Sequence, residues 1–217
     1  MTLPYQQPVL VLDACGANVQ TGICQNGKWL ARANSKGDAL ENLYDLCGVC
    51  LRETGLELKQ LGAYLFAEGP GSMLGIRLTA MAINTWRCLP GLDHPVFGYR
   101  SIDLAALELA EQKHLSNFAL VSRLRKKACI VLRSSESRSA EPEVLSDESI
   151  QALQEPVWEL LLKGRGPQTY PLLWPYSIES LPERLRRADL KLYAHETAAP
   201  FQIQKPEYQR WQGERHR

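Results

Sequence analysis

The chain has 217 residues, of which 45% are hydrophobic and 23% charged, and its formal net charge is +1. This is the composition of a soluble globular protein with one large domain or two small ones, and it requires neither nucleic acid nor an anionic membrane as a partner. No apolar run approaches the length of a membrane span, and the first seven residues lack a basic or apolar leader, so we expect a cytoplasmic protein. The six cysteines are expected to be core residues rather than disulfides.

The first half of the chain alternates strands and helices. Apolar runs and the Asn26-Gly27 turn predict a strand followed by a hairpin, and helical spacing with cap residues at Asp38 and Ser101 predicts three helices. The expected strands cover residues 9–13, 19–24, 28–33, 61–67 and 95–98, and the expected helices cover 38–54, 74–89 and 101–112. This βββαβαβα order predicts a ribonuclease-H-like subdomain over residues 1–112.

The second half is less regular, and we expect it to form a smaller subdomain over residues 113–217. It should contain a strand pair around a basic turn at 123–127, a short helix at 146–153, a buried strand at 157–162 and a helix at 178–188. The stretch 171–175, which begins and ends with proline, is expected to be irregular, and the segment from residue 198 lacks regular signals.

The most informative segment is a glycine-proline turn between a predicted strand and a predicted helix. Gly69 and Gly71 give the turn backbone freedom, Pro70 fixes one dihedral angle, and Ser72 is a suitable N-cap. Such a turn can present amide groups to an anion. A phosphate-binding loop would need a Lys-Ser or Lys-Thr pair, and a nucleophile elbow would need glycines on both sides of the serine. A dinucleotide site is closer, but its glycine spacing, ending at Gly75, is one residue too long.

Other motifs favour structural roles. Cys47 and Cys50 form a C-x-x-C pair, but both fall on the apolar stripe inside a predicted helix, which favours core packing over redox chemistry. Asp13 ends the first strand, the position where sugar-kinase and actin-like folds hold a carboxylate for metal-bound phosphates. The residues that follow Asp13 are not rich in Gly and Thr, which favours a structural role. The four histidines have no metal-binding spacing, so we expect neither a metal nor a cofactor. The basic clusters 123–127 and 184–187 could touch RNA phosphates, but solvated surface charge is the simpler interpretation.

The glycine-proline segment resembles the Gly-Pro-Gly-Ser-(Phe)-(Thr)-Gly-(Val)-Arg signature of the TsaB (YeaZ) family. Its counterparts here are Gly69, Pro70, Gly71, Ser72, Gly75 and Arg77. The segments 55–62, 95–105 and 206–210 are similar to other family segments in the same order. The departures are Ala14-Cys15 after the first strand, Met73-Leu74 within the signature and Ser122-Arg123-Leu124 after a later strand. These departures describe a divergent member.

The resemblance implies an actin/Hsp70-like (ASKHA) fold and a non-catalytic role beside TsaD in forming threonylcarbamoyladenosine at position 37 of tRNA. TsaD would bind directly, the TsaE ATPase would join the complex, and tRNA would be met only through the complex. A second copy would replace TsaD when TsaD is absent. The apolar helices then predict a partner interface, which comprises Leu43, Cys47, Cys50, Ile76, Met81 and Trp86.

Two alternatives stay open at this point. One is a nucleotide-dependent or glycoprotease-like enzyme on the same fold, which requires a metal or phosphate site. The other is a dinucleotide-binding reductase, which predicts a parallel sheet from residue 61 onward.

Overall fold

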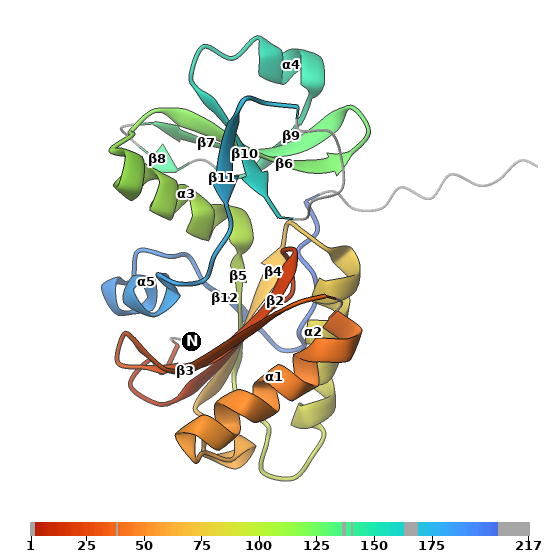
Figure 1. Ribbon diagram of the computed structural model, residues 1–217, viewed down its shortest axis with the longest axis vertical. Helices are drawn as coiled ribbons and strands as arrows, with labels where there is room; N and C mark the ends of the chain where they lie inside the picture. The colour runs from red at the N-terminus through yellow and green to blue at the C-terminus, as the bar shows by residue number, and fades with distance from the viewer. Residues whose placement is uncertain (1–2, 38, 136–137, 140, 163–168, 204–217) are drawn as a thin grey trace, which may run out of the picture.

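The computed structural model describes residues 3–37, 39–135, 138–139, 141–162 and 169–203, which form two β-sheets with helices packed on them (Figure 1). The strands are β1 (Val9–Asp13), β2 (Asn18–Gln25), β3 (Lys28–Lys36), β4 (Ala63–Gly69), β5 (Val96–Arg100), β6 (Phe118–Arg125), β7 (Ala128–Ser135), β8 (Arg138–Ser139), β9 (Glu143–Ser146), β10 (Val157–Leu161), β11 (Leu172–Pro175) and β12 (Tyr193–His195). The helices are α1 (Ala39–Thr54), α2 (Met73–Arg87), α3 (Ser101–Lys113), α4 (Asp147–Gln151) and α5 (Leu181–Arg187), with a 3₁₀ turn at Leu58–Gln60.

The first sheet has the strand order β12-β5-β4-β1-β2-β3. The β1–β2–β3 hairpins are antiparallel, whereas β1, β4 and β5 run parallel to one another. Asn26 and Gly27 have φ values of 52° and 78°, which is the paired left-handed conformation of a tight two-residue hairpin turn. The βββαβαβα order predicted from the sequence is confirmed, including the hairpin at this turn.

The second sheet repeats the plan of the first. Its order is β11-β10-β6-β7-β8, with β9 also paired to β7. As in the first sheet, the opening hairpin is antiparallel and the two later strands add in parallel on the other side. Two copies of one strand plan in a single chain confirm the two-part ribonuclease-H-like, actin/Hsp70-like fold. The second copy is reduced, because β8 has two residues and α4 has five.

Alternating side chains of the first sheet face two different cores. One face packs against α1 and α2, with Leu10, Leu12, Tyr64 and Phe66 completely buried. The opposite face packs against α3, α5 and the second sheet, where Val11 and its neighbours meet strand residues of both sheets. In Figure 1, α1 and α2 therefore lie at the lower end of the molecule, and the second sheet with α4 lies at the upper end.

Two expectations about the second half are wrong, and the sheet that one open alternative requires is not observed. The stretch around 171–175 forms strand β11, which is possible because an edge strand tolerates proline. The expected second subdomain, 113–217, is too long at its C-terminal end. Strand β12 belongs to the first sheet, because it pairs antiparallel with β5. The parallel sheet that a dinucleotide-binding reductase requires is also absent from the described residues, because β6 starts a new sheet with an antiparallel hairpin.

Two expectations fall outside the described residues: the Asp38 cap and the segment 206–210. In the part of the chain that the structure describes, no helix is both long and apolar enough to span a membrane.

Candidate partner-binding site

The signature turn links the end of β4 to the start of α2. Gly69 and Gly71 have φ values of 124° and 155°, which side chains rarely allow, and the Gly69–Pro70 bond is cis. The Ser72 side chain accepts a hydrogen bond from the Gly75 amide, so the predicted N-cap is confirmed. Ser101 does not cap α3: it is the first helical residue, and its hydroxyl donates to the Pro70 carbonyl at 2.6 Å.

This turn is pressed against the loop that follows β1. The Ser72 amide donates to the Cys15 carbonyl at 2.9 Å. A Cβ atom on Gly71 would lie 2.5 Å from the Cys15 carbonyl oxygen, and one on Gly75 would lie 2.2 Å from that of Ala14. These contacts leave no room for a phosphate between the loop and the start of α2. The geometry therefore assigns the signature glycines to close backbone packing rather than to an anion site.

Asp13 is similarly occupied by its own neighbours. It is completely buried, and one carboxylate oxygen accepts hydrogen bonds from Tyr99 at 2.6 Å and Tyr176 at 2.5 Å. The other oxygen accepts from the Cys15 amide at 2.8 Å. Burial raises the pKa of Asp13, while these three donors oppose the rise. Because Tyr99 lies on β5 and Tyr176 follows β11, this carboxylate ties the two sheets together, in agreement with a structural role.

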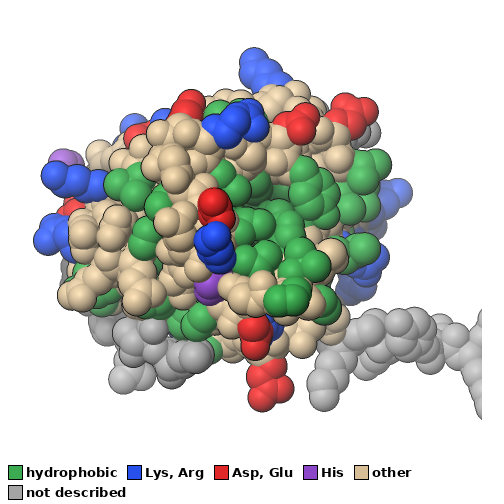
Figure 2. Space-filling model, turned by 90° about the horizontal axis from the view of Figure 1, so that it is seen from below, with side chains coloured by type: hydrophobic (Ala, Val, Ile, Leu, Met, Phe, Trp, Pro, Cys, Tyr) green, Lys and Arg blue, Asp and Glu red, His purple; other side chains and the backbone are tan. Residues whose placement is uncertain are grey.

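The outer side of the helix pair α1–α2 is hydrophobic and exposed. The α1–α2 face comprises Leu40 and Tyr44 on α1, Leu74 and Met81 on α2, and Leu89 just after α2, with exposed fractions from 50% to 68%. Leu74 and Met81 are seven residues apart, so they lie on one stripe of α2. Viewed from below, hydrophobic side chains gather on the side of the molecule where these helices lie (Figure 2). Contiguous apolar surface of this kind is typical of a site for another protein.

Four residues of the expected interface are not on this face. Leu43, Cys47, Cys50 and Ile76 are at most 2% exposed and belong to the cores beneath the helices. They face the sheet because both helices use these stripes to cover it, and they cannot contact a partner directly. The core interpretation of the C-x-x-C pair is confirmed, and burial raises the pKa of Cys47 to about 12. At this pKa the thiol is not poised for redox chemistry.

The remaining expected interface residues have different positions. Met81 is 62% exposed and lies on the α1–α2 face. Trp86 is half-buried between the helices, with its ring 5.9 Å from those of Tyr44 and Tyr64. The sequence argument missed Leu40, Tyr44, Leu74 and Leu89 as surface residues. The i, i+4 spacing of the first two could have identified them, because that stripe lies beside the one formed by Leu43 and Cys47.

The chain itself covers another side of α2. Asn84 exchanges two hydrogen bonds with the Ala198 backbone, at 2.9 and 3.0 Å, and the Phe201 amide donates to the Glu68 carbonyl at 2.7 Å. His195 on β12 lies 2.8 Å from the Glu68 carboxylate. With the sheet beneath it, α1 beside it and this segment bound at Asn84, α2 leaves its Leu74–Met81 stripe open.

The chain was compared with known proteins. No protein-family model matches it, and no curated protein matches it. Two solved structures match it over nearly their whole length. YeaZ from Pseudomonas aeruginosa is 16% identical, with a TM-score of 0.65 over 90% of this chain and 99% of that one. An uncharacterized protein with similarity to peptidase YeaZ from Pseudomonas aeruginosa is 15% identical, with a TM-score of 0.66 over 91% of this chain and 100% of that one.

This chain has the YeaZ fold. The match extends from the signature half into the reduced second half, so the fold implied by the sequence resemblance is confirmed over about 90% of the chain rather than for residues 9–110 alone. At 15–16% identity the likeness concerns the fold.

Proposed function

We propose that this chain is a TsaB-type accessory subunit that binds a TsaD-type partner through its α1–α2 face. The complex would form threonylcarbamoyladenosine at position 37 of tRNA, with the TsaE ATPase as a further member, in the cytoplasm. The observation that carries the proposal is the open hydrophobic stripe of α1 and α2 on a chain with the YeaZ fold. A second helix pair packed across this stripe would remove Leu40, Leu74 and Met81 from water.

A non-catalytic role is supported by the state of the two sites that an enzyme on this fold would need. Asp13, the candidate metal-binding carboxylate, is held by two tyrosines and an amide. The start of α2 is closed by the Ala14–Cys15 backbone. Among the described residues, no three His, Cys, Asp or Glu side chains form a group that could hold a metal ion. We therefore assign the transfer chemistry to the partner.

The test is association. The chain should co-purify with TsaD from the same genome and, without TsaD, should form a homodimer through the same face, measured by size exclusion with light scattering. Met81→Asp should weaken both assemblies about 100-fold or more, because a carboxylate would be buried in an apolar contact. Its stability should change by less than about 0.5 kcal/mol, since Met81 is exposed in the single chain.

Leu124→Asp is the matched control, because it places the same charge on another exposed side chain, in the hairpin of the second sheet. It should leave both assemblies intact. The proposal would be refuted if the chain stays monomeric at high concentration and does not bind TsaD. Equal damage from the two variants would show that the α1–α2 face is not the site.

A further inference from the structure

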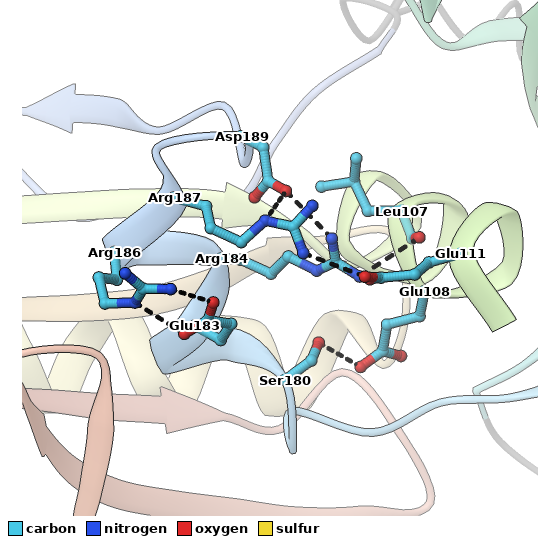
Figure 3. Close-up of polar contacts among 9 residues, drawn as sticks. All are labelled: Leu107, Glu108, Glu111, Ser180, Glu183, Arg184, Arg186, Arg187 and Asp189. Carbon is cyan, nitrogen blue, oxygen red and sulfur yellow. Dashed lines mark hydrogen bonds and ion pairs between the residues drawn. The ribbon is translucent and has the colours of Figure 1, made fainter.

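The sequence contains two basic clusters, residues 123–127 and 184–187. Their side chains have different partners in the structure. The cluster on α5 is neutralised by acidic residues of the chain (Figure 3). The Arg184 side chain is 4% exposed and pairs with Asp189 at 3.0 Å and with Glu111. Arg187 binds the same two carboxylates at 3.2 and 3.1 Å. Arg186 pairs with the neighbouring Glu183 at 2.5 Å. These arginines hold α5 against α3 or pair within α5, so little of their charge is available to a ligand.

The cluster on the β6–β7 hairpin is open. All residues from 123 to 127 are exposed. Arg123 is bound to Asp147 at 2.6 Å and to Thr169 at 2.7 Å. Within the described part of the chain, Arg125, Lys126 and Lys127 form no hydrogen bond or ion pair through their side chains. Among the described residues, these three neighbouring cations therefore have no hydrogen-bonded or ion-paired partner.

The hairpin turn projects these cations together. Arg125 pairs with Ala128 across the strands, so Lys126 and Lys127 form the two-residue turn between them. Lys127 has a φ of 63°, the left-handed conformation of such a turn. The buried pattern of β6 ends at Ser122, and from Arg123 onward the strand is exposed. The turn thus extends past the packed part of the second sheet.

Nearby acidic residues do not cancel this charge. Asp147, in the first turn of α4, is already bound by Arg123. The pKa of Glu148 is lowered first by its own backbone amide, then by the Ser146 hydroxyl, with Lys127 contributing less. Glu148 interacts electrostatically with Lys127 but is not ion-paired with it, so we expect the three cations to keep a positive field at the turn. The turn residues 123–127 also offer no aromatic ring on which a base could stack.

From these contacts we infer that Arg125, Lys126 and Lys127 bind the phosphate backbone of tRNA when the chain is part of its complex. This inference rests on the proposed function, which supplies the tRNA. Unpaired lysine and arginine side chains are the usual ligands of nucleic-acid phosphates, and such contacts position the polymer without reading its sequence. The hairpin would orient tRNA on the complex, while the partner acts on position 37.

The test compares two triple variants. Arg125→Glu/Lys126→Glu/Lys127→Glu changes the turn, and Lys28→Glu/Lys36→Glu/Lys113→Glu makes the same charge change at other exposed lysines. Binding of tRNA by each complex with TsaD is titrated at several salt concentrations. The turn variant should bind at least about tenfold more weakly near 0.1 M salt, and its salt dependence should lose a slope of about three, about one per phosphate contact. The control should match the wild type.

Light scattering on the same samples separates the two proposals. Failure of the complex to form contradicts the proposed function. Titration of tRNA with the chain alone, using the same two variants, then tests whether the turn binds tRNA. Unchanged tRNA affinity and slope in the turn variant would overturn the inference. Equal weakening in the control would also overturn it, because it would show a general effect of net charge. Loss of TsaD binding with unchanged tRNA affinity would make the turn a protein contact instead.

Discussion

The two faces of the first sheet carry helix pairs with opposite outer surfaces. On one face, α3 and α5 are joined by the ion pairs of Arg184 and Arg187 with Glu111, and Ser180 donates to Glu108 at 2.5 Å (Figure 3). On the other face, α1 and α2 touch each other through Tyr44 and Trp86, and their outer stripe is hydrophobic. Both pairs cover one sheet, but ion pairs and a hydrogen bond join the first pair, whereas an aromatic contact joins the second.

This difference separates the side on which the chain's own residues complete the packing from the side on which we propose that a partner binds. The α3–α5 pair is completed within the chain, since α3 packs against strands of both sheets and α5 supplies its ion-pair partners. The reduced second half has no described counterpart of α2, since residues 163–168 between β10 and β11 are outside the described residues and α4 has five residues. The side chains of the α1–α2 face accordingly stay 50% to 68% exposed.

The largest effect is expected where a charge is moved from the outer stripe to the inner one. Cys47→Asp should cost at least about 4 kcal/mol of unfolding free energy, because Cys47 is 2% exposed and its neighbours offer an aspartate no partner. Chemical denaturation would measure it, with Met81→Asp as the control that changes association rather than stability. If Cys47→Asp keeps wild-type stability and only loses its partner, the inner stripe belongs to the interface after all.

The sequence was sufficient for the elements of the first half but not for the orientation of its helices. Strand runs and helical spacing predicted the type and order of the elements from β1 to α3 correctly, although the bounds shift by up to three residues and Ser101 does not cap α3. Both α1 and α2 carry apolar residues on more than one stripe, so periodicity could not tell Leu43 and Cys47, which face the sheet, from Leu40 and Tyr44, which face outward. Only the position of the sheet resolves this ambiguity.

The second half shows what local patterns cannot predict. Strand β12 has three residues, and it forms because the edge of β5 is available about 95 residues earlier in the chain. The two basic clusters look alike in sequence but differ in how far their charges are neutralised. Glu111 and Asp189 bind the arginines of α5, whereas the other cluster lies at a hairpin turn. Pairing over such distances is a property of the fold rather than of the segment.

A smaller loss of stability is expected when the ion pairs between α3 and α5 are broken. Arg184→Met keeps the packed stem but removes the buried cation from Glu111 and Asp189, which keep Arg187 as their partner. Loss of one partner from a fully buried pair costs about 3 to 5 kcal/mol. Here Glu111 and Asp189 are partly exposed and keep Arg187, so we expect less, about 2 to 3 kcal/mol for the lost charged hydrogen bonds of Arg184. Chemical denaturation gives the stability, and light scattering should show unchanged assembly. A variant that is fully stable but dissociated would mean that α5, rather than the α1–α2 face, binds the partner.

The smallest effect is a pH dependence of the free energy of unfolding, which we expect from Asp103 on α3. This residue lines a cavity of about 220 Å³ with Glu141, Asp189 and Lys191. Burial raises the pKa of Asp103 to about 6, although the charge of Arg100 opposes the rise. Since the folded-state pKa exceeds the unfolded value of 3.8, the stabilisation is complete below pH 4 and is lost as the pH rises through 6.

Asp103→Asn removes this titration, so the variant should gain about 2 kcal/mol relative to the wild type between pH 4 and pH 7. The free energy of unfolding at a series of pH values measures the difference. Asp45→Asn, an exposed carboxylate on α1, controls for the lost charge. A difference between Asp103→Asn and the wild type that is constant over this range would show that the cavity leaves Asp103 as well solvated as a surface residue. The α3–α5 side of the molecule would then gain no pH dependence from the Asp103 carboxyl group.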